Sequence, residues 1–163
     1  MDPDRPYRTL LIQDARDRTR TLGAVDAILV GGDIAFRGAP EEYAAALDWL
    51  KELSDQCGCP LERVFVIPGN HDVDRAVITG SASVRNVQAA ISNASNREKE
   101  LRDQFSDAEA GRSLLAPVEA YNAFAARFNC QIYAPDKLFW HQDLQLDANT
   151  ILRVYGLTST LLS

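Results

Sequence analysis

Two short polar segments carry the residue types of this chain that are best suited to chemistry. VGGDIAFRG (30–38) contains Asp33, and PGNHD (68–72) contains Asn70 followed directly by His71. Carboxylate and amide oxygens suit hard divalent cations, and an imidazole serves either as a metal ligand or as an acid and base near neutral pH. If the two segments lie together, these three side chains predict a metal-dependent site.

Each polar segment follows a run that is typical of a buried strand. VDAILV (25–30) ends at a pair of glycines, and RVFVI (63–67) ends at Pro68. The clearest helical pattern, 40–53, lies between them and begins with Pro40, which suits a first helical position. This order predicts a βαβ unit with parallel neighbouring strands. Because the carboxyl ends of parallel strands form one rim of a sheet, the two polar segments should meet there.

Each polar segment also has a more ordinary interpretation when it is taken alone. A Gly-Gly-Asp sequence after a strand is commonly a turn, and a single histidine at a strand end is commonly a surface or core residue. At matched ends of one βαβ unit, Asp33, Asn70 and His71 together favour a shared site. The neighbouring glycines permit sharp bends, and Asp72 is placed to accept a hydrogen bond that would orient His71.

The rest of the chain changes from helical to strand patterning. Apolar residues first recur at helical spacing, and then alternate with polar residues as in a half-buried strand. The patterns predict a helix at 7–22 ending near Gly23, a helical stretch at 81–130 with capping boxes at Ser95–Glu98 and Ser106–Glu109, a helix opened by Pro117, and a hairpin of 143–147 and 150–157.

Composition limits the classes of function. The 163 residues are 46% hydrophobic, which suits one domain with a real core. The 17 basic and 23 acidic side chains give a net charge of −6, which argues against a general nucleic-acid or membrane-surface binder. No run is apolar enough to cross a bilayer, and the charged MDPDRPYRTL is unlike a signal peptide. Three cysteines, an odd number, indicate reduced thiols and a cytoplasmic location.

Two blocks of this sequence resemble a known family. GGDIAFRG and PGNHDVDR are similar to the Gly-Asp-x4-Gly and Gly-Asn-His-Asp blocks of the calcineurin-like metallophosphoesterase superfamily, and LRVYGLTST resembles the strand after its helical insert. The resemblance implies an α/β fold: a partial αββα sandwich with a helical insert after the second strand and a C-terminal β-hairpin. The insert, 76–135, is the candidate lid over the site.

The same resemblance implies roles for the three site residues. The expected activity is hydrolysis of a phosphoester, as in a phosphatase or phosphodiesterase, by a metal-bound hydroxide at two divalent metal ions, such as manganese, iron or zinc. Asp33 corresponds to the carboxylate that bridges both metals, and Asn70 to a ligand of the second metal. His71 corresponds to the group beside the scissile phosphate that protonates the leaving oxygen or stabilises its charge.

The chain departs from the family pattern in its remaining metal ligands. It contains neither an Asp-x-His nor a Gly-His-x-His block, and its second histidine, His141, precedes the predicted hairpin with an expected structural or exposed role. Asp14 and Asp17 belong to the first predicted helix and do not replace the missing motif. We therefore expect 1–163 to be a single, incomplete metallophosphoesterase domain from the interior of a longer chain, weakly active or inactive by itself.

Other interpretations remain open. A catalytically degenerate phosphoesterase fold would act as a binding or regulatory module, while a generic nucleotide-binding domain is disfavoured because Gly-x-Gly-x-x-Gly and P-loop motifs are absent. Missing strands would leave open sheet edges, so we expect self-association or contact with further domains. Arg37 and Arg75 flank the two motif segments, where they could contact phosphate or pair with acids. The sequence does not identify the phosphoester substrate.

Overall fold

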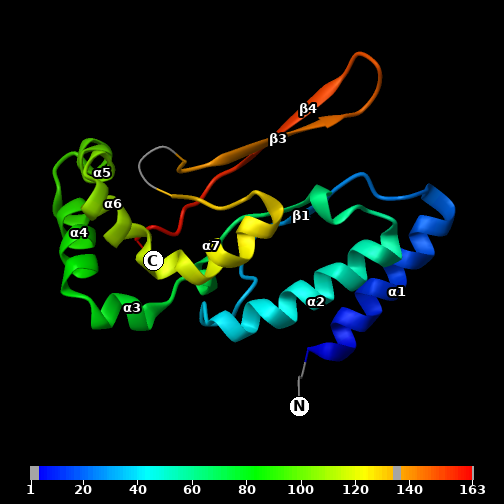
Figure 1. Cartoon of the computed structure of the whole chain (residues 1–163), viewed down its shortest axis with the longest axis horizontal. Coiled ribbons are helices and arrows are strands. Elements are labelled where there is room, and N and C mark those ends of the chain that lie inside the picture. The colour runs from blue at the N-terminus through cyan, green and yellow to red at the C-terminus, as the bar shows by residue number, and fades with distance from the viewer. Residues whose placement is uncertain (1–3, 134–136, 163) are drawn as a thin grey trace.

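The βαβ unit predicted from the sequence is present in the computed structural model, which describes residues 4–133 and 137–162. Figure 1 shows it beside a helical insert and a projecting hairpin. The elements are α1 (Arg5–Leu22), β1 (Ile28–Val30), α2 (Pro40–Cys57), η1 (Leu61–Arg63), β2 (Val64–Val66), η2 (Asn70–Asp72), α3 (Arg75–Gly80), α4 (Ala82–Asn93), α5 (Arg97–Ser106), α6 (Ala108–Leu115), η3 (Ala116–Val118), α7 (Glu119–Ala125), η4 (Ala126–Phe128), β3 (Trp140–Gln145) and β4 (Ile151–Gly156).

The strands β1 and β2 are parallel neighbours, as predicted, with Ile28 opposite Val64. Both strands are shorter than expected, and each has three residues paired in the sheet. All three β2 residues are buried, but in β1 the side chain of Leu29 is 62% exposed, so the prediction of a buried first strand is wrong for this position. Leu29 is paired with Phe65, and the indole of Trp140 from the hairpin lies 5.9 Å from the Phe65 ring.

The helices α1 and α2 pack against each other and against β1. Ile12 of α1 packs with Leu53 and Cys57 of α2, and Ile28 of β1 contacts the same cluster. The start of α2 is fixed by Glu42, whose carboxylate accepts hydrogen bonds from two backbone N–H groups of the preceding turn. This cap places the loop after β1 directly beside the first turn of α2.

The helical insert runs from α3 to η4, and the two residues 134–135 of its predicted range lie outside the described residues. Its helix caps differ by one residue from the predicted capping boxes. Asn96 accepts from the Lys99 amide and Asp107 accepts from two amides, in place of Ser95 and Ser106. Asn and Asp are N-caps at least as effective as Ser, so the competing serines do not set the helix starts. Pro117 lies in η3, immediately before α7.

The insert and the hairpin both hold the end of β2. Tyr121 of α7 and Trp140 of β3 each donate a hydrogen bond to the Val66 carbonyl oxygen, at 3.0 Å. The hairpin β3–β4 is antiparallel, with Trp140 opposite Gly156, and its far end projects from the body of the molecule in Figure 1. His141 is an exposed residue within β3 rather than before the hairpin, and its ring lies 5.8 Å from Tyr155.

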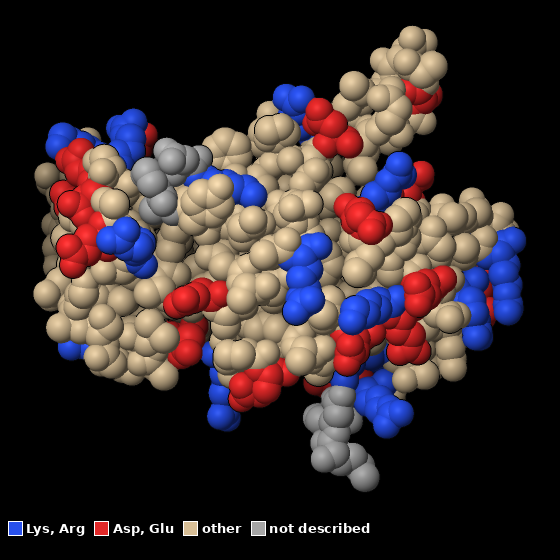
Figure 2. Space-filling view, in the orientation of Figure 1, with Lys and Arg blue, Asp and Glu red and all other residues tan. Residues whose placement is uncertain are grey.

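These elements confirm the predicted α/β class, the helical insert and the C-terminal hairpin. Acidic and basic side chains are interspersed on the face shown in Figure 2, and the far part of the hairpin is mostly uncharged there. Among the described residues, no helix combines the length and the apolar character needed to span a membrane.

Candidate active site at the strand ends

The loops after β1 and β2 lie against each other and bring two of the three predicted site residues together. The backbone N–H of His71 donates a hydrogen bond to Asp33 Oδ1 at 3.0 Å. Asn70 is exposed and is the first residue of η2, directly before His71. The parallel strands therefore place these residues on one rim, which is what the βαβ pattern predicted.

The close approach of the two loops depends on a glycine in each of them. Gly32 has φ of 99°, and a Cβ atom there would lie 2.6 Å from the Gly69 nitrogen. A Cβ atom at Gly69 would in turn overlap Asp33. Asp33 itself has φ of 53°, a left-handed conformation that Asp adopts more readily than most residues. Side chains at the two glycine positions would thus push the rim apart.

Asp72 joins the two loops and does not orient His71 as predicted. Its side chain is fully buried, and Oδ2 accepts hydrogen bonds from the N–H groups of Ile34 at 3.1 Å and Gly69 at 2.8 Å. Oδ1 accepts from the Ala35 N–H and the Tyr43 hydroxyl, both at 2.9 Å. Four donors satisfy this buried carboxylate, so it clamps the β1 loop, the β2 loop and α2.

Tyr43 is held as a donor in this clamp. Burial and then the nearby carboxylate of Asp72 raise the pKa of the Tyr43 hydroxyl well above its ordinary value. The hydroxyl is therefore protonated at neutral pH and donates to Asp72. The helical pattern of 40–53 carries no signal for this hydrogen bond, because the partner of Tyr43 lies 29 residues away in the sequence.

The imidazole of His71 is held by the β1 loop rather than by its neighbour in sequence. Nδ1 lies 2.9 Å from the backbone oxygen of Phe36, and the two rings stack with centroids 5.3 Å apart and planes inclined by 21°. A carbonyl oxygen only accepts, so Nδ1 carries the proton in this hydrogen bond. The other ring nitrogen, Nε2, is therefore the one that is left to exchange a proton with a ligand.

The donor set of the rim does not fit a complete two-metal centre. Asp33 offers a carboxylate with one oxygen already bonded to an N–H group, and Asn70 offers an amide oxygen. Over residues 4–133 and 137–162, no group of three or more His, Cys, Asp and Glu side chains is arranged to hold a metal ion. Two metal ions need several ligands each. The rim therefore accounts for only part of the metal centre that the motifs imply.

A pocket of about 590 Å³ opens beside Asp33 and His71. Its walls come from the start of α1, the loop after β1, the first half of α2 and His71, and none of the described residues of the insert lines it. The lid role of the insert stays a prediction. The lining residues are Asp4, Arg8, Val30, Gly32, Asp33, Ile34, Ala35, Phe36, Glu42, Ala45, Ala46, Trp49, Leu50 and His71.

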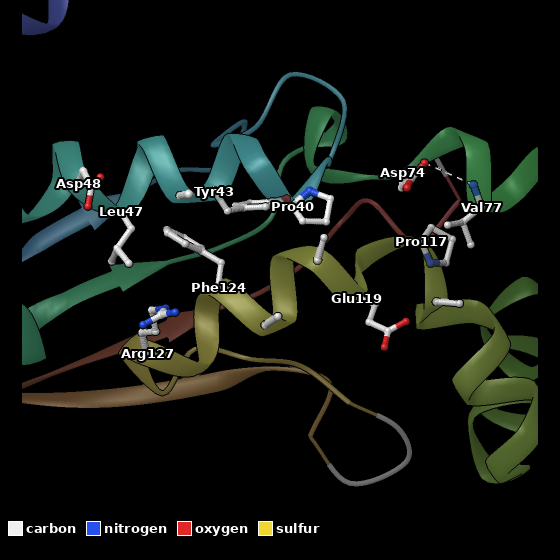
Figure 3. Close-up of a pocket in the computed structure, with 14 residues that line it drawn as sticks. Pro40, Tyr43, Leu47, Asp48, Asp74, Val77, Pro117, Glu119, Phe124 and Arg127 are labelled. Carbon is white, nitrogen blue, oxygen red and sulfur yellow. Dashed lines mark hydrogen bonds between the residues drawn. The ribbon is translucent and has the colours of Figure 1, made fainter.

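A second cavity, of about 580 Å³, lies between α2 and α7 and contains none of the predicted site residues. Figure 3 shows Phe124 of α7 directed toward Tyr43 and Leu47 of α2. The rings of Tyr43 and Phe124, both residues of the core, are 5.1 Å apart, so core side chains form part of the wall of this cavity. Asp48 and Arg127 lie at one end of it (Figure 3).

The other polar residues singled out in the sequence lie apart from the rim or on its outside. The Arg37 guanidinium lies 5.9 Å from the centroid of the Phe36 ring, and Arg75 is exposed at the start of α3. Asp14 and Asp17 form ion pairs on the exposed surface of α1. The three cysteines are buried free thiols, and burial raises the pKa of each.

Comparison with known proteins bears on this geometry. A family model described as calcineurin-like phosphoesterase matches residues 6–159, which include the rim, the insert and the hairpin. No curated protein and no solved structure gives a significant match.

Proposed function

Because the chain belongs to the calcineurin-like phosphoesterase family, we propose that it is a domain for metal-dependent hydrolysis of a phosphoester, with Asp33 and Asn70 as metal ligands and His71 as the general acid. The observation that carries this proposal is the hydrogen bond from His71 Nδ1 to the Phe36 carbonyl oxygen. It fixes the ring and leaves Nε2 for the substrate, in a pocket that Asp33 also lines.

The chemistry assigned to His71 is proton donation. In the imidazolium form, Nε2–H donates its proton to the oxygen that leaves phosphorus, and the ring returns to the neutral form with Nδ1–H retained. The hydrogen bond to Phe36 and the stacked ring hold the imidazole through both states. General acid catalysis by a positioned side chain contributes on the order of 10²–10⁴ in rate.

The incomplete donor set limits what this chain does by itself. A carboxylate and an amide oxygen, with water as the other ligands, bind a divalent cation weakly. We therefore propose that residues 1–163 form an incomplete domain whose further metal ligands lie outside the described residues, and that turnover by the chain alone is low or absent. The free thiols support the proposal of a reducing, cytoplasmic location.

Metal binding and turnover test this proposal separately. The chain is titrated with Mn²⁺ and its binding followed by electron paramagnetic resonance, and hydrolysis of bis(4-nitrophenyl) phosphate is then measured at saturating Mn²⁺. Asp33→Ala should abolish Mn²⁺ binding, while His71→Ala should keep binding and lose whatever turnover the chain has. Asp48→Ala, an exposed aspartate on α2, serves as the matched control. Unchanged Mn²⁺ binding in Asp33→Ala would refute the assignment of the ligand.

A second candidate function is a binding or regulatory module with a degenerate site. The observation that favours it is the clamp of Asp72, which holds both loops in place through protein groups alone. A rim of this kind is preformed and needs no metal to be ordered. Tight binding of a phosphoester with no turnover, even at saturating Mn²⁺, would favour this second function over the first.

A further inference from the structure

One peptide group of the loop after β1 connects His71 to the first turn of α2. Its carbonyl oxygen, which belongs to Phe36, lies 2.9 Å from His71 Nδ1. Its N–H group, which belongs to Arg37, donates a hydrogen bond to Glu42 Oε2 at 3.0 Å. A trans peptide is planar, so its C=O and N–H groups point in opposite directions. The Glu42 carboxylate therefore fixes the plane that presents the carbonyl oxygen to the imidazole.

Two carboxylates hold the loop on either side of Phe36. Asp72 accepts hydrogen bonds from the N–H groups of the two residues before Phe36. Glu42 accepts from the residue after it and from Ala39. Gly38 packs closely against the other loop, because a Cβ atom there would lie 3.0 Å from the backbone oxygen of Asp72. With both sides of the loop held, the Phe36 carbonyl group has little freedom to turn away from the imidazole.

An ordinary role for Glu42 is that of a helix cap. Glu42 is the third residue of α2, and its carboxylate accepts from the N–H group of Ala39, the residue that precedes the helix. A capping box needs this hydrogen bond only. The additional hydrogen bond from Arg37, two residues further upstream, is not part of the cap. It joins the carboxylate to the peptide that binds His71.

The charge of Glu42 also strengthens the hydrogen bond to the imidazole. Hydrogen bonds in a chain polarise one another, and one to an ionised acceptor is roughly twice as strong as one between neutral groups. The Arg37 N–H group bonds to a carboxylate, so the Phe36 C=O group of the same peptide becomes a better acceptor. A better acceptor beside Nδ1 favours the tautomer of His71 that carries its proton on Nδ1.

Resting on the proposed function for its catalytic consequence, we propose that Glu42 is a positioning residue for His71. Its carboxylate fixes the peptide between Phe36 and Arg37, and this peptide sets the direction and the tautomer of the imidazole. Glu42 acts through the peptide and not on the ring itself. Proton donation from Nε2 then returns the ring to the Nδ1–H form that the peptide favours.

The imidazole ¹⁵N chemical shifts of the ¹⁵N-labelled chain report the tautomer of His71. They are recorded in metal-free buffer at alkaline pH, where imidazole is neutral. His71 of the wild-type chain should carry its proton on Nδ1. The exposed His141 is the second of the two histidines in the sequence and serves as the internal reference. A wild-type His71 with its proton on Nε2 would overturn the inference, and this measurement needs no variant to fold.

Three variants separate the contact of Glu42 from its charge and from the helix cap. Glu42→Ala should lower the ratio of the Nδ1–H to the Nε2–H form of His71 about fivefold, the order of one net hydrogen bond. Glu42→Gln should lower it less than about twofold, because both N–H groups bond to one oxygen, Oε2, which an amide oxygen can replace. Glu41→Ala removes an exposed carboxylate from the same helical turn and is the matched control, with no change expected. An unchanged ratio in Glu42→Ala, or an equal fall in Glu41→Ala, would reduce Glu42 to a helix cap and overturn the inference.

The tautomer of His71 depends on neither turnover nor metal binding. If turnover with Mn²⁺ is found, Glu42→Ala should lower kcat about fivefold and leave the affinity for Mn²⁺ unchanged. If the tautomer responds as expected but turnover is absent, the hydrolase proposal fails and the positioning role of Glu42 stands. If turnover depends on His71 but its tautomer does not respond to Glu42, the positioning role fails alone.

Discussion

Replacing Asp72 with asparagine tests the clamp that positions the candidate site. The change keeps the size of the side chain and removes one of its two acceptor oxygens. The wild-type carboxylate accepts from three backbone N–H groups and the Tyr43 hydroxyl in a fully buried place. Whichever way the new amide is turned, its NH₂ group faces at least one backbone N–H.

The best orientation of the amide sets the expected cost. If Nδ2 takes the place of Oδ1, the Tyr43 hydroxyl can turn to accept from it, but the Ala35 N–H is left without an acceptor. An unpaired buried donor costs about 1–3 kcal/mol. The Ile34 and Gly69 N–H groups then bond to a neutral oxygen, which loses about 1 kcal/mol each. The free energy of unfolding should therefore fall by about 3–5 kcal/mol.

Urea unfolding followed by far-ultraviolet circular dichroism measures this loss. Asp48→Asn, on the exposed surface of the same helix that carries Tyr43, is the matched control and should change stability by less than about 0.5 kcal/mol. A loss of less than about 1 kcal/mol in the free energy of unfolding of Asp72→Asn would refute the reasoning, because one unpaired buried N–H group by itself should cost at least that much.

The Tyr43→Phe variant keeps the test informative if Asp72→Asn does not fold. It removes one donor to the carboxylate and leaves the other three in place, so it should cost about 1–2 kcal/mol. In the double variant the two losses should not add, because both residues belong to one network. Additive losses would show that the Tyr43 hydroxyl and Asp72 do not interact.

Further predictions concern Gly32, the β3–β4 hairpin, the exposed Leu29 of β1 and the three buried thiols. Gly32→Ala should cost about 2 kcal/mol or more and weaken Mn²⁺ binding, because its positive φ and the nearby Gly69 backbone leave no place for a methyl group. Arg153 lowers the pKa of Asp143 by its hydrogen bonds, so the pair stabilises the hairpin above about pH 4 and ceases to do so as the pH falls through the lowered pKa. The thermal midpoint of Arg153→Gln should thus lie below wild type at neutral pH and equal it near pH 2, and a constant difference would contradict the assignment. Leu29→Ser should reduce concentration-dependent self-association in sedimentation velocity, because it removes an exposed apolar side chain. A strictly monomeric wild-type chain would show that Leu29 has no role in self-association. The buried thiols, with raised pKa, should react slowly with iodoacetamide until the chain unfolds, and rapid labelling of the native chain would exclude this burial.

Local patterns of the sequence were sufficient to predict the framework of the site. Apolar runs that stop at glycine or proline, separated by one amphipathic helix, predicted parallel strands with Asp33 and His71 on a common rim, and the register of β1 and β2 agrees. The covalent order and the period of the apolar residues fix such features, because strand, helix and turn depend mainly on near neighbours. The metal roles of Asp33 and Asn70 stay predictions.

Only the tertiary structure decided what holds the site residues. Three of the four donors to Asp72 lie 29 to 38 residues away in the sequence, and none of the four belongs to its neighbour His71. Phe36 takes the orienting role that Asp72 was expected to have. Arg8 lines the pocket because α1 packs against α2, which no local pattern specifies. Contacts between distant segments depend on how whole elements pack, and the direction of a side chain at a strand end is set by that packing rather than by its position in the sequence.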